Sequence, residues 1–340
     1  MFLSSHPYMP CVQRALHRSW LAIFISLATT GCANESEEEA IPAKNPLTVS
    51  DAFAAHWRDG LAEVAVYRLT QPRYGELREG EAIWVTVTEP FDSERLVKRD
   101  VADGRHLEVL KLNDMRTFET GLYDYRTMSS TFVPTTQQTP VKITASVQEW
   151  CGHVYEELRW GAERVDRTLH SYFEGEQDAS DTWPQPADGW TEDAFPLMMR
   201  RSAGDPLLEL GERRDIQWLP SRVGARLRND SGAWRPAVVS RGMTPRTQPG
   251  PSGPILVDEW TVEAEGFTHR WLVEAKPPHG VVSWERSDGE RGERVAVQRT
   301  DYWARQKGSD SELRLKLGLE VRGVEPMGRK PDSSALNEAP

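Results

Sequence analysis

The chain has 340 residues, with 41 lysine and arginine residues against 52 aspartate and glutamate residues, and a formal net charge of −11. This length is enough for one large domain or two ordinary ones. No basic stripe that could neutralise a phosphate backbone is present, so the sequence argues against nucleic-acid binding. Glycine and proline are spread along the chain and the recurrent apolar spacing is two, which argues against a helical bundle.

Residues 1–31 predict a lipoprotein signal peptide. A basic region at 14–18 precedes the apolar run "WLAIFISLA" at 20–28, which is too short for a stable membrane anchor, and "TTGCA" follows directly. The small residues before Cys32 resemble the lipobox of bacterial lipoproteins, whose cysteine is lipidated and begins the mature chain. Thr29 stands where a lipobox usually has leucine, and ordinary secretion with cleavage nearby is the alternative. We expect Cys32 to carry fatty-acyl chains such as palmitate.

The two ends of the mature chain have the composition of solvated segments. Residues 32–50 contain "NESEEEAIPAKNP", which is acidic and carries prolines, and they predict a flexible tether. Residues 307–340 end in "GRKPDSSALNEAP" and predict a polar, disordered tail.

Between these ends the sequence predicts a mainly β fold. Period-two apolar runs separated by turn residues indicate a first antiparallel β region at 51–181 and a second at 218–306. Residues 182–217 predict a helical or irregular connector, with a short helix over "TEDAFPLMMRRS" that contains Pro196. We expect antiparallel curved sheets or a partly open β-barrel, joined by this short connecting segment.

Several motifs carry a resemblance to a known family. The stretches "QPRYGELREGEAIWVTVTEPF", "FETGLYDYRTMSSTF", "SVQEWCGHVY" and "HSYFEGE" are similar to a family of uncharacterised bacterial envelope lipoproteins, often labelled septum formation inhibitor Maf. The resemblance implies an envelope location and the same fold class. It implies no reaction, and the exported, β-rich chain argues against the nucleotide pyrophosphatase activity to which that label belongs.

The stretch "SVQEWCGHVYEELRW" holds the candidate catalytic residues. A single strand over 139–155 points Glu149, Cys151 and His153 to one face. In a thiol hydrolase or acyltransferase, His153 lowers the thiol pKa and Glu149 orients the imidazole. The alternative, a buried core cysteine beside ordinary polar residues, is favoured because a mid-strand position offers no backbone donors for an oxyanion.

The stretch "HSYFEGE" places His170, Tyr172 and Glu174 on one strand face, where they line a polar cavity or belong to a solvated surface. No HExxH, CxxC, GxSxG or phosphate-loop pattern occurs. The sequence therefore predicts no metal site and no cofactor, and it favours a non-enzymatic role.

Of the 13 tryptophans, the 12 in the mature chain are expected to line an apolar cavity or to fill the sheet cores. We expect a membrane-anchored lipoprotein of the cell envelope, facing the periplasm or the cell exterior, that binds an apolar ligand or assists envelope assembly. A structural lipoprotein that interacts with an envelope protein is the second hypothesis, and a thiol-dependent hydrolase is the third. The expected partners are the membrane, through the N-terminal lipid, and an apolar small molecule or an envelope protein.

Overall fold

The computed structural model describes residues 48–100, 106–200, 207–250 and 253–323. Strands account for 53% of the structure and helices for 12%. The strands form one large, mostly antiparallel sheet that is not closed. The predicted mainly β fold class is therefore confirmed.

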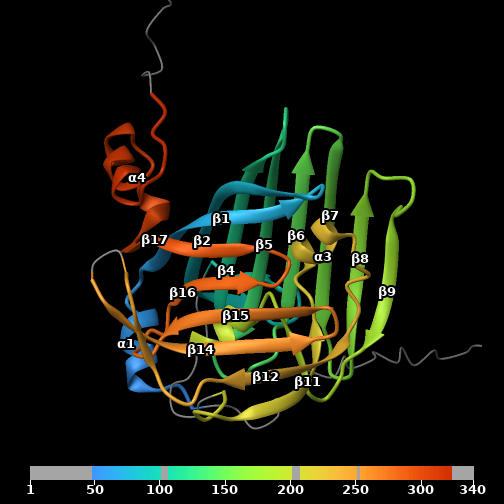
Figure 1. Cartoon of the computed structure of the whole chain (residues 1–340), viewed down its shortest axis with the longest axis horizontal. Coiled ribbons are helices and arrows are strands. Elements are labelled where there is room, and N and C mark those ends of the chain that lie inside the picture. Colours follow the sequence, from blue (N-terminus) through green and yellow to red (C-terminus); the bar gives the residue numbers. More distant parts are fainter. Residues whose placement is uncertain (1–47, 101–105, 201–206, 251–252, 324–340) are drawn as a thin grey trace, which may run out of the picture. The chain divides into compact units, whose positions relative to one another are not determined.

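The strands of the first half run from the N-terminal helix to residue 184 (Figure 1). They are β1 (Ala62–Arg73), β2 (Glu76–Asp92), β3 (Val97–Lys98), β4 (Leu107–Glu119), β5 (Asp124–Pro134), β6 (Lys142–Glu149), β7 (Gly152–Trp160), β8 (Arg164–Ser171) and β9 (Ala179–Pro184).

The strands of the second half follow after a short connection. They are β10 (Gly189–Thr191), β11 (Arg213–Leu219), β12 (Arg235–Arg241), β13 (Arg246–Gln248), β14 (Ile255–Ala264), β15 (Phe267–Glu274), β16 (Val281–Arg286) and β17 (Arg291–Thr300).

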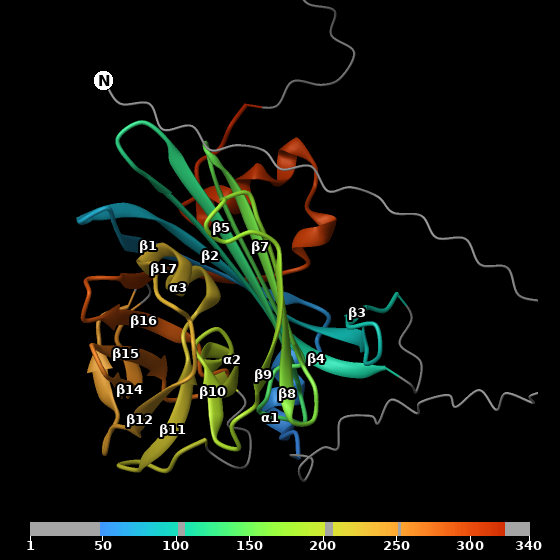
Figure 2. The ribbon, with the colours of Figure 1, turned by 90° about the vertical axis from the view of Figure 1, so that its right-hand side faces the viewer.

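Strand β1 joins the two halves into one sheet, because it pairs with β2 on one side and with β17 on the other. From β2 the sheet continues through β4, β5, β6, β7 and β8 to β9. From β17 it continues through β16, β15, β14, β12 and β11 to β10, and the β10–β11 pair is parallel. Figure 2 shows the second-half strands facing β5–β9, with helices α2 (Phe195–Arg200) and α3 (Arg222–Arg228) between them.

Helix α2 is the core of the predicted connector helix, and Pro196 is its second residue, where the missing N–H has no intrahelical partner to lose. Phe195, Leu197 and Met199 of α2 are buried to 1% exposure or less. Burial of such side chains contributes about 1.5–3 kcal/mol each, so α2 holds the two halves together.

Tryptophan side chains fill the space around α2. The largest hydrophobic cluster contains seven of them, Trp57, Trp84, Trp190, Trp218, Trp260, Trp271 and Trp284. Trp84 and Trp284 stack with ring centroids 4.9 Å apart, and Phe195 meets Trp271 edge-on at 5.0 Å. The interior of the curved sheet is therefore a packed core.

The remaining helices lie at the two ends of the described chain. Helix α1 (Asp51–Trp57) is capped by Ser50, whose hydroxyl accepts from the Phe53 N–H at 3.2 Å, and it buries Phe53 and Trp57 in the core. The 3₁₀ helices η1 (Tyr302–Ala304) and η2 (Gly308–Ser311) lead into α4 (Glu312–Lys316).

Part of the segment expected as a disordered tail is therefore ordered. Leu317 and Leu319, which follow α4, are buried at 6% against Val64, Val66 and Val85 of the first two strands. The alternating leucines of "LKLGL" supply the apolar contacts that hold this segment on the sheet. Residues 324–340 lie outside the described residues.

The long strand expected over 139–155 is wrong. The chain turns at Trp150 and Cys151, and β6 and β7 pair as a hairpin with Glu149 opposite Gly152. The expected inward face is correct as far as the turn, because Ile143, Ala145 and Val147 are buried.

Candidate functional site

The lipidation candidate Cys32, the signal peptide predicted for 1–31 and the tether up to residue 47 lie outside the described residues. The lipid anchor therefore stays a prediction from the sequence.

Cys151 lies at the exposed tip of the β6–β7 hairpin and not at the edge of the core. The Cys151 N–H donates to the Glu149 carboxylate at 2.6 Å. Through hydrogen bonding and its negative charge, Glu149 raises the pKa of the Cys151 thiol. No hydrogen bond joins His153 to Cys151, although both residues are described. A nucleophile needs the opposite shift, so this arrangement gives no support to thiol catalysis.

The predicted pocket-lining residues lie on the surface around the β8–β9 turn. His170 is at the end of β8, with its ring nitrogen 3.4 Å from Asp178. Tyr172 and Glu174 follow the strand and are exposed, Tyr172 to 73%. All three side chains are exposed to solvent.

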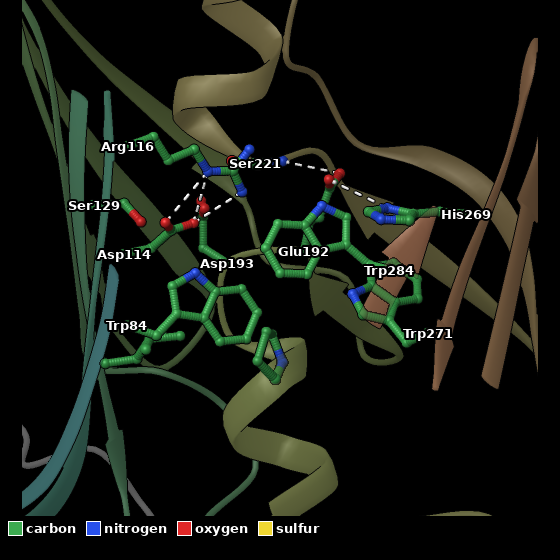
Figure 3. A pocket seen from close by; sticks show the side chains of 12 residues that line it. Trp84, Asp114, Arg116, Ser129, Glu192, Asp193, Ser221, His269, Trp271 and Trp284 are labelled. Carbon is green, nitrogen blue, oxygen red and sulfur yellow. Dashed lines mark hydrogen bonds and ion pairs between the residues drawn. The ribbon is translucent and has the colours of Figure 1, made fainter. Parts of the chain in front are cut away.

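Charged side chains meet in the interior between the two halves of the sheet (Figure 3). We call this group the ionic cluster, and it consists of Asp114 and Arg116 from β4, Glu192 and Asp193 before α2, Arg228 from α3, His269 from β15, Arg286 from β16 and Glu290 before β17.

Arg116 is the centre of one half of the ionic cluster. Its guanidinium donates to Asp114 at 2.8 Å and to Glu290 at 2.8 Å, and Arg228 donates to the other Glu290 oxygen at 3.2 Å. Burial raises the pKa of Glu290, but Arg116 and Arg228 outweigh this effect and hold it at about 2. Glu290 is therefore ionised throughout the neutral range.

Glu192 and Asp193 are adjacent in the chain but differ in their pKa. Glu192 accepts from the Ser221 N–H at 3.2 Å and lies 3.4 Å from His269, and its pKa stays well below the usual range despite burial. Burial raises the pKa of Asp193 to about 6, although the Arg222 N–H donates to it at 3.0 Å. Two carboxyls with separated pKa values are a pattern of acid–base sites.

The space beside the ionic cluster is too small for a substrate. Trp84, Trp271 and Trp284 border a cavity of about 30 Å³, which is room for a water or two. The cluster binds the residues before α2 to β15, β16 and the start of α3, and it binds β4 to the residue before β17. In this arrangement it holds these segments together.

A larger cleft lies between α3 and the inner face of β6–β8. Its volume is about 290 Å³, close to the lower end of small-molecule sites. Ala145 and Val147 of β6, Val154 of β7 and Leu169 of β8 form an apolar floor. We call this space the α3 cleft.

Charged groups border the α3 cleft. Arg222 binds Glu156 through two hydrogen bonds of 2.9 and 3.1 Å, and Arg167 donates to the same carboxylate at 2.5 Å. Arg226 on α3 donates one hydrogen bond, of 2.5 Å, to Glu176 in the β8–β9 turn and its side chain is 22% exposed. A guanidinium has five N–H donors, so Arg226 has donors left for an anionic group.

Comparisons with protein-family models, with curated proteins and with solved structures find no match for this chain. None of the helices in the described ranges is long and apolar enough to span a membrane. Within the same ranges, no group of three or more His, Cys, Asp or Glu side chains is arranged to hold a metal ion.

Neither the ionic cluster nor the α3 cleft was predicted from the sequence. A signal for the cluster is present in "TEDAFPLMM", where two acidic residues directly precede an apolar run that must be buried. The cleft combines three strands with a helix that follows about fifty residues later, and no local pattern marks it.

Proposed function

We propose that this chain is a membrane-tethered lipoprotein of the bacterial cell envelope that binds a small apolar or amphipathic ligand in the α3 cleft. The N-terminal sequence supports the location, through the basic region, the short apolar run and Cys32. The observation that carries the binding role is the apolar floor of the α3 cleft beside Arg226.

The ligand class follows from this lining. Ala145, Val147, Val154 and Leu169 offer only methyl groups, which favour an alkyl chain or a flat apolar ring. Each buried methylene group contributes about 0.8 kcal/mol, and the translational and rotational freedom lost on binding offsets part of this gain. Arg226 favours a carboxylate or another anionic head group at the mouth.

Laurate is a suitable probe, with binding measured by calorimetry on the mature chain carrying Cys32→Ala. The proposal predicts that Leu169→Trp, which fills the cleft floor, weakens laurate binding at least about tenfold. Leu256→Trp is the matched control, because Leu256 is on β14 outside the cleft and is 43% exposed. Equal laurate affinity of the two variants, or no binding to the unsubstituted chain, contradicts the proposal.

A lipoprotein that acts by binding another protein is the second candidate. It is favoured by the packed interior of the sheet, in which α2 and seven tryptophans occupy the space expected for an internal ligand.

A further inference from the structure

Exposed aromatic and apolar side chains stand at four hairpin turns of the first-half strands. The turns are β1–β2, β4–β5, β6–β7 and β8–β9, and antiparallel pairing places all four at the same end of these strands. The side chains are Tyr74 (59% exposed), Leu122 (80%), Trp150 (69%) and Tyr172 (73%), together with the half-buried Tyr123. We call these five residues the tip band.

Contacts within the tip band hold the rings in place. The Tyr74 and Tyr125 hydroxyls are hydrogen-bonded at 2.7 Å, and the Tyr123 hydroxyl donates to Tyr74 at 3.3 Å. The Arg73 guanidinium lies 4.3 Å from the Tyr74 ring centroid, and the Tyr123 and Trp150 rings are 6.4 Å apart. Side chains that are ordered before binding lose less entropy when a partner docks.

Gly152 allows Tyr172 of the tip band to pack against the β6–β7 turn. The Tyr172 ring lies directly over this glycine, and a Cβ added to Gly152 would meet the ring at 2.6 Å. Only glycine permits this close approach, which brings Tyr172 beside the β6–β7 turn that carries Trp150.

The charge around the tip band is negative. The four turn segments, 73–76, 119–126, 148–153 and 170–178, contain seven carboxylates and two arginines. In the described residues, no basic side chain forms an ion pair with Glu119, Glu149 or Glu174, whereas Asp124 is paired with Arg126. Tyrosine and tryptophan faces also attract cations.

The negative charge of the tip band favours a protein over a membrane as its partner. Membrane surfaces with anionic head groups attract basic segments, and they repel an acidic surface such as these four turns.

We propose that the tip band is a docking surface for a partner protein that presents a basic segment with apolar side chains. The aromatic residues supply the buried contacts, since tyrosine and tryptophan dominate the energetics of protein interfaces. The unpaired carboxylates of Glu119, Glu149 and Glu174 select a basic partner.

A labelled octapeptide of alternating lysine and leucine serves as the probe, with binding to the mature Cys32→Ala chain followed by fluorescence polarisation. Trp150→Ala should weaken binding about tenfold, and Trp303→Ala should not, because Trp303 is 47% exposed outside the tip band. Glu174→Lys should also weaken binding, whereas Glu265→Lys, in the exposed β14–β15 turn, should have little effect.

An octapeptide of alternating glutamate and leucine should not bind. The proposal is overturned if this acidic peptide binds equally, if neither peptide binds, or if the tip-band variants behave like their controls. It is also overturned if Trp150→Ala abolishes binding to phosphatidylglycerol vesicles but not to the basic peptide, which assigns the surface to lipid. Laurate binding in the α3 cleft should be unchanged by Trp150→Ala, so this test fails or succeeds independently of the proposed ligand site.

Discussion

Arg116 of β4 and Glu290 before β17 lie 2.8 Å apart, although 174 residues separate them in the chain. Their ion pair joins the first half of the sheet to the second half across the interior. Glu290 also forms an ion pair with Arg228 of α3, so the helix that borders the α3 cleft is held by the same carboxylate. The ionic cluster therefore fixes the position of one wall of the proposed ligand site.

Loss of Arg116 should destabilise the fold. Arg116→Met leaves Asp114 and the 2%-exposed Glu290 without their main partner, which costs about 3–5 kcal/mol for a buried pair. Chemical denaturation measures the change. Arg126→Met is the matched control, because Arg126 forms the same i, i+2 strand pair with Asp124 on the surface, and little change is expected there. Equal effects of the two substitutions contradict a role for the ionic cluster.

Asp193 should make stability depend on pH. Its folded-state pKa of about 6 is above its ordinary value of 3.8, so between these values the folded chain holds a proton that the unfolded chain releases. Stability therefore falls as pH rises through this window, and the loss approaches about 3 kcal/mol. Asp193→Asn removes the effect.

The measurement is the difference in free energy of unfolding between Asp193→Asn and the unsubstituted chain from pH 4 to pH 7. As pH rises, the free energy of unfolding of Asp193→Asn should increase steadily relative to that of the unsubstituted chain. Taking the difference cancels the contributions of His269, whose pKa is lowered by burial, and of Glu192 and Glu290. A difference that stays constant across this range shows that Asp193 is not protonated in the fold.

Cys151 should react with iodoacetamide in the native protein, because it stands at an exposed hairpin turn. Glu149→Gln should increase the rate a few-fold at pH 8, since the carboxylate raises the thiol pKa and lowers the thiolate fraction. His153→Ala should leave the rate unchanged. A sharp slowing on loss of His153 is the result expected of an activated thiol and supports catalysis instead.

Cys32→Ala should abolish fatty-acid labelling of the chain and release it from the membrane fraction. The reason is that the lipobox-like sequence offers Cys32 as the acylated residue. Metabolic labelling followed by fractionation checks this result. A variant that is still labelled and membrane-bound disproves the lipoprotein assignment.

Local patterns predicted the mainly β fold correctly. The turn between β14 and β15 uses Gly266 and the turn before β17 uses Gly289, both with positive φ, and glycine at such positions is visible in the sequence. The β6–β7 turn was missed because Trp150 and Cys151 are not turn formers. The expected shared face of Glu149, Cys151 and His153 depended on an unbroken strand and was lost with it.

The interior could not be predicted in the same way. The contacts of Arg116 and Glu290, or of Arg222 and Glu156, join residues far apart in the chain, and only the curvature of the sheet brings them together. Seven tryptophans lie in the interior as expected, whereas Trp150 and Trp303 are exposed. Whether the seven fill or line that interior depends on where α2 packs. The α3 cleft could not be predicted for the same reason, because it depends on where a helix packs against strands far from it in the chain.

Methyl chemical-shift mapping during a laurate titration shows whether the α3 cleft binds an apolar ligand. We expect saturable shifts of the Ala145, Val147, Val154 and Leu169 methyl groups, with little change at Leu122 in the tip band or at Leu317 beside α4. Absence of shifts at the four cleft residues, or shifts confined to Leu122 and Leu317, contradicts ligand binding in this cleft.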